Sequence, residues 1–307
     1  MKKTIRIGTR DSELALWQAH TVKSQLELLG YDTELIPVKS TGDLILNKPL
    51  YELGITGIFT KTLDIAMLNG DIDIAVHSMK DVPTALPKGI VQAAVLKRAA
   101  VSDILVHKGD INFLNENKDI TTIATGSLRR KAQWLHKYPN HQIVDLRGNV
   151  NTRLQKLSES SWAGAIFAQA GLQRINLTPD NHLILDWMIP APAQGAMLVV
   201  AMENDSFTRN ALIALNDEKT AVCTNIERDF LRTLEGGCTA PIGAIAEIKD
   251  DMLFFEGALF SLDGTQKLTL KKSIHINQAK GYGVSCAHEI LNNGGKALME
   301  AIKKELS

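Results

Sequence analysis

The chain has 307 residues, a formal net charge of zero at pH 7 and 45% hydrophobic residues. This length predicts two or three globular domains. The balanced charge argues against a nucleic-acid partner held by a general basic surface. Its three scattered cysteines do not form a disulfide framework, and no cysteine or histidine spacing is typical of a metal site, so no metal is expected.

The first ten residues are basic but are not followed by the apolar segment of a signal peptide. No apolar run approaches the length that spans a membrane. We therefore expect a cytoplasmic protein with reduced thiols and no membrane partner.

The first hundred residues alternate strand-like and helical segments, as in the opening of an α/β domain. Strands are expected at 5–8, 33–38, 71–76 and 90–96, and helices from Asp11 or Ser12 to Gly30 and over about 60–68. Arg10 and Ser12 fall at a helix N-terminus, where the backbone favours anions. A solvated loop arginine is the alternative interpretation of Arg10.

The strand at 71–76 leads into His77-Ser-Met-Lys80-Asp81-Val-Pro83. Ligands of open α/β sheets bind at the carboxyl ends of strands, so Lys80 and Asp81 are catalytic candidates. The alternative is a surface ion pair, which contributes little to stability. His77 is the one histidine at a strand end, where a packed residue is as compatible with the sequence as a member of a catalytic triad, and a triad is otherwise poorly supported.

A charged segment at 97–103 and a proline-rich one at 190–196 predict two crossings between domains. Between them, strands are expected at 123–124, 142–146 and 165–168. Arginines follow each of these strands, at positions Arg129, Arg130, Arg147, Arg153 and Arg174. If the three strand ends share one sheet edge, these side chains form a cleft for a polyanion. Helix-start arginines in solvent are the alternative.

After the second crossing we expect a strand at 197–202 and helices at 210–215 and 220–234. The loop that follows holds Gly236, Gly237 and Cys238, and the glycines leave room for a large partner beside the thiol. An inert turn cysteine is equally compatible with this local sequence. Strands at 242–248, 252–260 and 268–276, then helices at 283–291 and 295–306, predict an α+β domain.

Six ordered stretches, spread from end to end of the chain, resemble the porphobilinogen deaminase (hydroxymethylbilane synthase) family. They are Ile7–Ser12 with Ala15–Ala19, Asp73–Pro83, Thr125–Arg130, Leu146–Arg153, Ala170–Arg174 and Leu234–Cys238. No single stretch is specific, but the six in order are.

The resemblance implies two periplasmic-binding-protein-like α/β domains around a cleft and a C-terminal α+β domain, in a monomer. The expected first domain holds residues 1–98 and 196–217 and carries the catalytic aspartate. The second, 99–195, binds substrate and cofactor, and the third, 218–307, carries the attachment cysteine.

The resemblance also implies the reaction. The family joins four porphobilinogen units head to tail, releases ammonia at each step and hydrolyses the product to hydroxymethylbilane in tetrapyrrole biosynthesis. One dipyrromethane cofactor is held covalently, here on Cys238. Asp81 matches the catalytic carboxylate, which would stabilise the azafulvene cation left by ammonia loss and assist proton transfer.

The remaining site residues are carried over by position. Cofactor binding is expected from Lys80, Thr125, Ser127, Arg129, Arg130 and Gly237, and substrate binding from Arg10, Ser12, Phe59, Arg147, Arg153, Arg174 and Gln194. These arginines would concentrate positive charge in the cleft of a neutral protein and hold the acetate and propionate groups of the pyrroles.

The chain departs from the family at residues 54–59, which read Gly-Ile-Thr-Gly-Ile-Phe, and at Glu52, where a lysine is common. Ala163 and Ala193 also replace an aspartate and a glycine that are common there. The altered residues 54–59 leave open an enzyme-derived chain without activity. The layout of two domains with two crossings leaves open a non-enzymatic carboxylate-binding protein of the periplasmic-binding-protein type.

Overall fold

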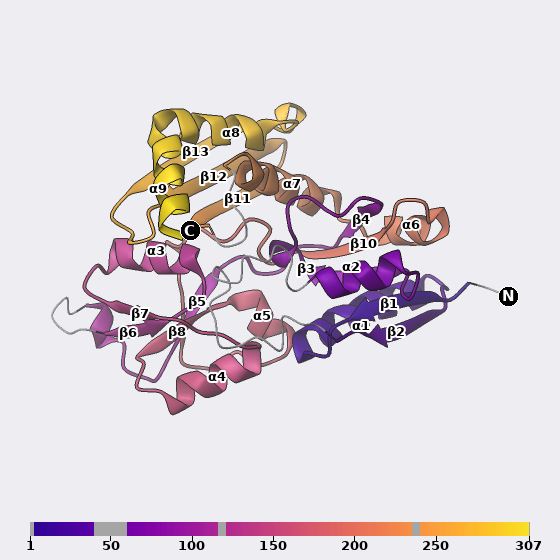
Figure 1. Ribbon diagram of the computed structural model, residues 1–307, viewed down its shortest axis with the longest axis horizontal. Helices are drawn as coiled ribbons and strands as arrows, with labels where there is room; N and C mark the ends of the chain where they lie inside the picture. The colour runs from indigo at the N-terminus through magenta and orange to yellow at the C-terminus, as the bar shows by residue number, and fades with distance from the viewer. Residues whose placement is uncertain (1–2, 40–59, 116–120, 235–239, 307) are drawn as a thin grey trace. The chain divides into compact units, whose positions relative to one another are not determined.

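The computed structural model describes residues 3–39, 60–115, 121–234 and 240–306 (Figure 1). The chain divides into two compact units. It leaves the first unit after Ala99, returns to it at Gly195 and enters the second again at Cys223. Phe59, Gly237 and Cys238, which the sequence analysis placed in the site, lie outside the described residues.

A five-stranded sheet forms the centre of the first unit, in the order β2-β1-β3-β10-β4. Its strands are β1 (Ile5–Thr9), β2 (Thr33–Pro37), β3 (Ile74–Ser78), β4 (Ile90–Val95) and β10 (Met197–Met202). Strand β1 runs parallel to β2 and β3, whereas β10 is antiparallel to β3 and β4. The ends of β1 and β3 therefore share one sheet edge, and Arg10 and the short 3-10 turn Met79–Asp81 follow there.

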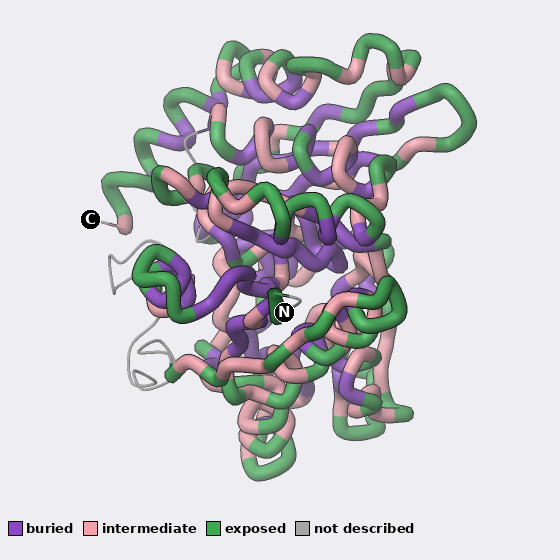
Figure 2. The backbone as a smooth tube through the Cα atoms, turned by 90° about the vertical axis from the view of Figure 1, so that its right-hand side faces the viewer, coloured by how far each residue is buried: buried purple, intermediate pink, exposed green. Residues whose placement is uncertain are grey.

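The helices of this unit cover the sheet and supply part of its core. They are α1 (Glu13–Leu28), α2 (Lys61–Leu68) and α6 (Ser206–Leu212), the last followed by a 3-10 turn at Ile213–Leu215. Ala19, Val22 and Leu26 recur at helical spacing on α1 and are fully buried against Ile5 and Ile7 of β1. In Figure 2, buried segments are purple and lie in the interior, whereas the outer turns of helices are green because they are exposed.

A second five-stranded sheet lies in the second unit, in the order β7-β6-β8-β5-β9. Its strands are β5 (Asp103–His107), β6 (Thr122–Ala124), β7 (Gln142–Val144), β8 (Gly164–Ala168) and β9 (His182–Ile184). Strands β6, β7 and β8 run parallel, so their ends share one edge as the sequence predicts. Strand β5 is antiparallel to β8, and its first residue, Asp103, pairs with Ala168, so β5 begins at that same edge.

Both faces of this second sheet are buried. On one face Ile104 and Phe167 pack with Leu157, and on the other Leu105 and Ile166 pack with Trp134, as the two-residue period of a strand requires. The helices are α3 (Leu128–Lys137), α4 (Val150–Glu159) and α5 (Gln169–Arg174), with a 3-10 turn at Asn112–Leu114.

A three-stranded antiparallel sheet, β11-β12-β13, completes the second unit. The strands are β11 (Ile242–Lys249), β12 (Met252–Phe260) and β13 (Lys267–His275). The helices of this part of the chain are α7 (Glu218–Thr233), which enters the second unit at Cys223, α8 (Tyr282–Ile290) and α9 (Lys296–Leu306), with a 3-10 turn at Ile276–Gln278 and a π-turn at Leu291–Gly295. The sheet packs on α3, because Ala132 and Ile189 bury against Ala258 and Phe260. Its β12–β13 turn also touches α3, where His136 Nδ1 lies 2.8 Å from the Gly264 carbonyl oxygen.

The predicted α/β fold with a C-terminal α+β part is confirmed. Strands β5 and β9 were not predicted, because Asp103 and its charged neighbours resemble a crossing and β9 is short. Strand β3 begins at Ile74 rather than residue 71, since the Asp73 carboxylate accepts the hydrogen bond of the Arg6 backbone N–H. Helix α6 begins at Ser206 because Asp205 caps it through Thr208 N. The cleft and the three domain boundaries stay predictions.

Among the described helices, none has both the length and the apolar character needed to cross a membrane.

Candidate functional site

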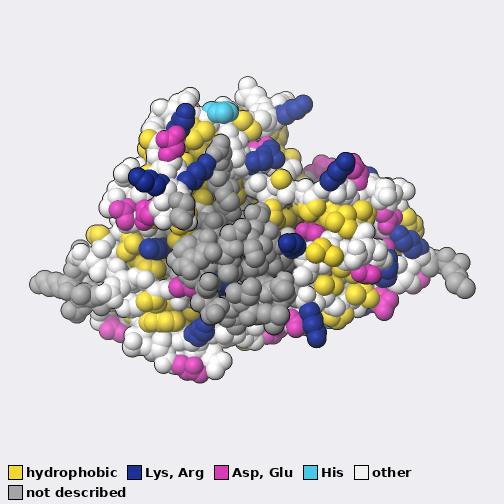
Figure 3. Space-filling view, viewed as in Figure 1, with side chains coloured by type: hydrophobic (Ala, Val, Ile, Leu, Met, Phe, Trp, Pro, Cys, Tyr) yellow, Lys and Arg dark blue, Asp and Glu magenta, His cyan; other side chains and the backbone are white. Residues whose placement is uncertain are grey.

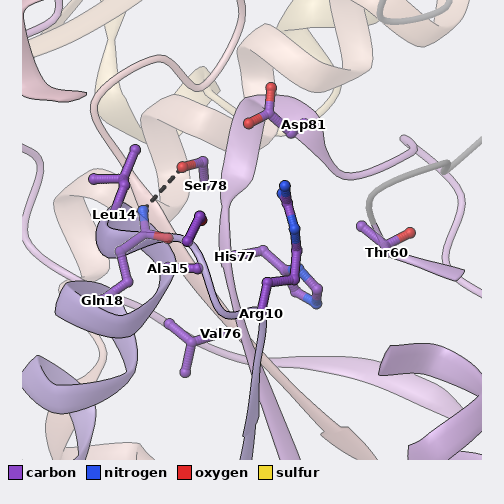
Figure 4. A pocket seen from close by; sticks show the side chains of 10 residues that line it. Arg10, Leu14, Ala15, Gln18, Thr60, Val76, His77, Ser78 and Asp81 are labelled. Atoms are coloured by element: carbon purple, nitrogen blue, oxygen red, sulfur yellow. Dashed lines mark hydrogen bonds between the residues drawn. The ribbon is translucent and has the colours of Figure 1, made fainter. Parts of the chain in front are cut away.

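A small cavity of about 80 Å³ opens at the shared edge of β1 and β3 in the first unit (Figure 4). It is lined by Arg10, Ser12, Leu14, Ala15, Gln18, Thr60, Val76, His77, Ser78 and Asp81. Three predicted site residues, Arg10, Ser12 and Asp81, therefore meet here. They converge because parallel strands deliver their following residues to one edge.

Asp81 occupies the last position of the 3-10 turn that follows β3. The turn is fixed by Met79, which is fully buried and whose backbone N–H donates to the Ala196 carbonyl oxygen at 3.0 Å. Lys80 is half-buried, and Asp81 is exposed. Figure 4 shows the Arg10 side chain extending toward the Asp81 carboxylate. A carboxylate on a rigid turn, open to a ligand and flanked by a guanidinium, is suited to stabilising positive charge and moving a proton.

Three further polar residues, Gln18, His77 and Ser78, line the same cavity. Gln18 Nε2, buried on α1, donates to Ser78 Oγ at 2.9 Å. His77 is 6% exposed, and its Nε2 has no hydrogen-bond partner among the described residues. Burial, with a smaller contribution from the Arg10 charge, lowers the pKa of His77 to about 4. Its imidazole is therefore neutral at pH 7 and adds no charge beside Asp81.

The second unit places the other arginines at the edge where β6, β7 and β8 end. Thr125 follows β6, and its Oγ1 accepts the Ser127 backbone N–H at 3.3 Å. Ser127 is the N-cap of α3 and accepts from Arg130 N at 3.4 Å. Arg129 therefore sits in the first turn of a capped helix, a position that favours anions.

Arg129 and Arg130 are both buried and share one carboxylate, Asp103. Arg129 Nη1 donates to Asp103 Oδ2 at 2.7 Å, and Arg130 Nε donates to Oδ1 at 2.9 Å. Gln194 Nε2 donates to the same Oδ1 at 3.1 Å and to the Val101 carbonyl oxygen at 2.7 Å. Burial lowers the pKa of Arg129, and the Asp103 charge opposes that effect. Four buried polar side chains thus form one cluster.

The remaining predicted arginines follow the two neighbouring strand ends. Arg147 follows β7 and is 5% exposed. Arg153 lies on α4, and its Nε donates to the Gly148 carbonyl oxygen at 2.7 Å. Arg174 closes α5, where burial lowers its pKa to about 10. Together with Arg129 and Arg130, these side chains gather guanidinium groups at this sheet edge.

The described residues on one face of the molecule show a different distribution of charge. On the face drawn in Figure 3, lysine and arginine side chains are interspersed with acidic ones. The positive charge that matters for an anionic ligand is therefore held in partly buried groups at the sheet edges, which agrees with a net charge of zero.

Sequence reasoning missed three polar residues of these two clusters: Gln18, Ser78 and Asp103. Gln18 had a usable signal, since it is a polar residue on the apolar side of α1. Asp103 had none, because its role depends on β5 running antiparallel to β8. Gln194 was expected to bind substrate, and the described structure shows it fully buried with its amide on Asp103.

Residues 5–210 match the family model described as porphobilinogen deaminase, dipyromethane cofactor binding domain, and residues 221–292 match the porphobilinogen deaminase C-terminal domain. A porphobilinogen deaminase of Desulforamulus reducens is 40% identical over 307 residues, 99% of each chain. One of Cytophaga hutchinsonii is 39% identical over 100% of this chain and 99% of the other. Among solved structures, the methionine-binding protein MetQ is similar with a TM-score of 0.45 and 16% identity, over 69% of this chain and 89% of that one.

Proposed function

Because this chain belongs to the porphobilinogen deaminase family, we propose that it condenses four porphobilinogen molecules head to tail, releases ammonia at each step and hydrolyses the product to hydroxymethylbilane. The observation that carries the proposal is the match of the family to nearly the whole chain, at 40% identity. The meeting of Arg10 and Asp81 in one cavity supports it, since the reaction needs a carboxylate next to a carboxylate-binding group.

The cofactor that fits the second unit is dipyrromethane, one per chain, bonded to Cys238. Two buried guanidinium groups share a single carboxylate, and Arg129 Nε has no hydrogen-bond partner among the described residues. A carboxylate of the cofactor would supply the missing acceptor and negative charge. When bound, the group supplies the pyrrole carbon to which substrate is joined. Arg129, Arg130, Thr125, Ser127 and Lys80 are the residues proposed to hold it.

Asp81 is proposed to stabilise a cationic intermediate and to assist proton transfer. Its exposed carboxylate, fixed by the buried Met79, stabilises the cation that remains when ammonia leaves and takes part in proton transfer at the pyrrole. Arg10 and Ser12 orient an incoming substrate carboxylate beside it. Neutral His77 leaves the electrostatics of this cavity to Arg10 and Asp81.

Arg147, Arg153 and Arg174 are proposed to bind the acetate and propionate groups that accumulate as the product grows. They follow the ends of β7 and β8, at the same sheet edge as Arg129. Guanidinium groups there bind carboxylates in two-point fashion while remaining charged at any physiological pH. Gln194, Phe59 and Gly237 keep their predicted places in the site as part of this proposal.

A non-enzymatic carboxylate-binding protein remains the alternative from another class. It rests on a fold resemblance, and such a protein has no need of Asp81 or of a thiol tether. An inactive enzyme-derived chain is motivated only by residues 54–59, which lie outside the described residues. Release of ammonia from porphobilinogen separates the enzyme from both.

Two readouts of one preparation test the proposal. The intact mass of protein purified from cells should exceed the sequence mass by one two-pyrrole adduct, and incubation with porphobilinogen should release ammonia and form hydroxymethylbilane. An unmodified chain that releases no ammonia would refute the proposal. A monomeric state and a cytoplasmic location are also proposed, and sedimentation and cell fractionation check them.

A further inference from the structure

The shared carboxylate of Asp103 is fully buried at the first position of β5. Its Oδ2 accepts from Arg129, while its Oδ1 accepts from Arg130 Nε and from Gln194, and Arg130 Nη2 lies 2.8 Å from the same oxygen. A buried carboxylate with four such contacts is fixed in position, and it fixes the groups that donate to it.

The two arginines are held in different ways. Arg130 uses its Nε–Nη2 edge on Asp103 and donates from Nη1 to the Ile166 carbonyl oxygen at 2.9 Å. Both hydrogen bonds that Arg129 makes to described residues come from Nη1, to Asp103 and to the Ile189 carbonyl oxygen at 2.8 Å. The Nε–Nη2 edge of Arg129 is thus uncommitted within the described chain, and Nε is buried without a partner.

The acceptors that hold Arg129 are themselves rigid. The Ile189 carbonyl oxygen also accepts from Gln133 Nε2 at 2.8 Å, and Gln133 Oε1 accepts the Ile189 backbone N–H at 2.8 Å. Gln133 stands one turn after Arg129 on α3. Two fixed oxygens therefore accept hydrogen bonds from Nη1 of Arg129. This leaves one orientation for the rest of the guanidinium group.

The net charge of the Arg129, Arg130 and Asp103 cluster also favours a bound carboxylate. Two guanidinium groups and one carboxylate leave one buried positive charge without a counter-ion in this cluster. The Nε–Nη2 edge of an arginine matches the two oxygens of a carboxylate, and burial makes the pairing strong. A single ligand carboxylate would both neutralise the cluster and satisfy Arg129 Nε.

We propose that Asp103 is a positioning residue for carboxylate binding: it holds Arg129 so that the Nε–Nη2 edge faces a cofactor or substrate carboxylate, and leaves one positive charge for that carboxylate to balance. This inference rests on the proposed function. It adds a residue that touches no ligand, and it assigns the binding atoms of Arg129.

The test compares Asp103→Asn and Asp103→Glu with Asp73→Asn. Asp73 is the matched control, because it is a buried aspartate directly before a strand and binds Arg6 through Nε and Nη2 at 3.0 Å. Each protein is made without cofactor and incubated with porphobilinogen. The fraction that gains the two-pyrrole adduct is read from the intact mass, and kcat, KM and melting temperature are measured on the loaded enzyme.

For Asp103→Asn we expect severalfold less loading and a KM raised by about tenfold, since a guanidinium displaced by about 1 Å loses much of its two-point contact. The kcat should change much less. Asp103→Glu keeps the charge and should load better than Asp103→Asn. Asp73→Asn should lose stability but load as the parent does.

The inference is overturned if folded Asp103→Asn loads like the parent with an unchanged KM, or if Asp73→Asn loses loading to the same extent. Should Asp103→Asn fail to fold, Asp103→Glu decides: its longer side chain shifts both arginines, so an unchanged KM would refute the positioning role. A parent chain that gains no adduct would refute the proposed function instead, and the two failures are thereby separated.

Discussion

His77 lies near the end of β3 and is buried, whereas Asp81 lies in the turn that follows and is exposed. The exposed carboxylate is accessible to a ligand, whereas burial keeps the imidazole neutral. From the sequence alone, the two residues differ only in the chemistry of their side chains. Their different surroundings, set by the 3-10 turn after β3, decide which one can take part in the reaction.

Replacing Asp81 with alanine should stop elongation and leave the fold intact. We expect ammonia release to fall by about 100-fold or more, as for loss of a general acid or base, while the free energy of unfolding changes by roughly 0.5 kcal/mol or less, since the residue is exposed. Asp71→Ala, an exposed aspartate at the other end of β3, is the control and should retain full turnover. Near-normal turnover in Asp81→Ala would remove its assigned role.

His77 predicts a pH dependence of stability. Its folded pKa of about 4 lies below its ordinary value, so the unfolded chain binds the proton first as the pH falls. The stabilisation is complete above about pH 6.5 and declines from there to about pH 4. The loss is roughly 3 kcal/mol, taking about 1.36 kcal/mol for each pKa unit.

Urea unfolding of the parent and of His77→Gln across this pH range measures the effect. The variant should show a flatter decline between pH 6.5 and pH 4, because glutamine does not titrate. Parallel curves for the two proteins would show that His77 is not protonated preferentially in the unfolded state.

At the scale of elements, α3 links the arginine cluster to the C-terminal sheet. Its first turn carries Arg129 and Arg130. Further along the helix, Ala132 packs against β12, and His136 contacts Gly264 in the β12–β13 turn. The helix pattern was predictable from the sequence. The docking of a distant hairpin on it was not, because it depends on Gly264 meeting α3 backbone far away in the chain.

Gly264→Ala should break this contact. Gly264 has φ +76°, and an added Cβ would stand 2.5 Å from the Ala132 carbonyl oxygen and 2.6 Å from His136 N. We expect a loss of about 2–5 kcal/mol in denaturant unfolding, from backbone strain plus overpacking. Gly281→Ala is the control, since φ is +74° with nothing within 4 Å of the added atom. It should lose only about 1–2 kcal/mol, the strain alone. Equal losses would show that the contact with α3 is not what Gly264 protects.

At the scale of the whole molecule, one covalent tether is expected in a chain with three cysteines. Cys223 and Cys286 are 5% and 2% exposed, and burial raises the pKa of the Cys286 thiol to about 11. Neither is suited to react, because the thiolate is the nucleophile. This agrees with the proposal that Cys238 is the attachment point.

Cys238→Ser should therefore have the bare sequence mass and release no ammonia, whereas Cys223→Ser and Cys286→Ser, if folded, should each keep one adduct. Intact mass spectrometry of the three variants gives the answer. An adduct on Cys238→Ser would place the cofactor elsewhere.

The sequence by itself determined the family, the strand-then-arginine pattern of Arg129, Arg147 and Arg174, and Asp81 at a strand end, because these depend on local periodicity and on neighbours along the chain. The tertiary structure decided which groups meet. Asp103 looked like part of a linker, and only the antiparallel pairing of β5 with β8 carries its carboxylate to the arginines. Gln18 likewise reaches Ser78 only after α1 packs against β3. Contacts between residues far apart in sequence depend on strand direction and packing, which no local pattern contains.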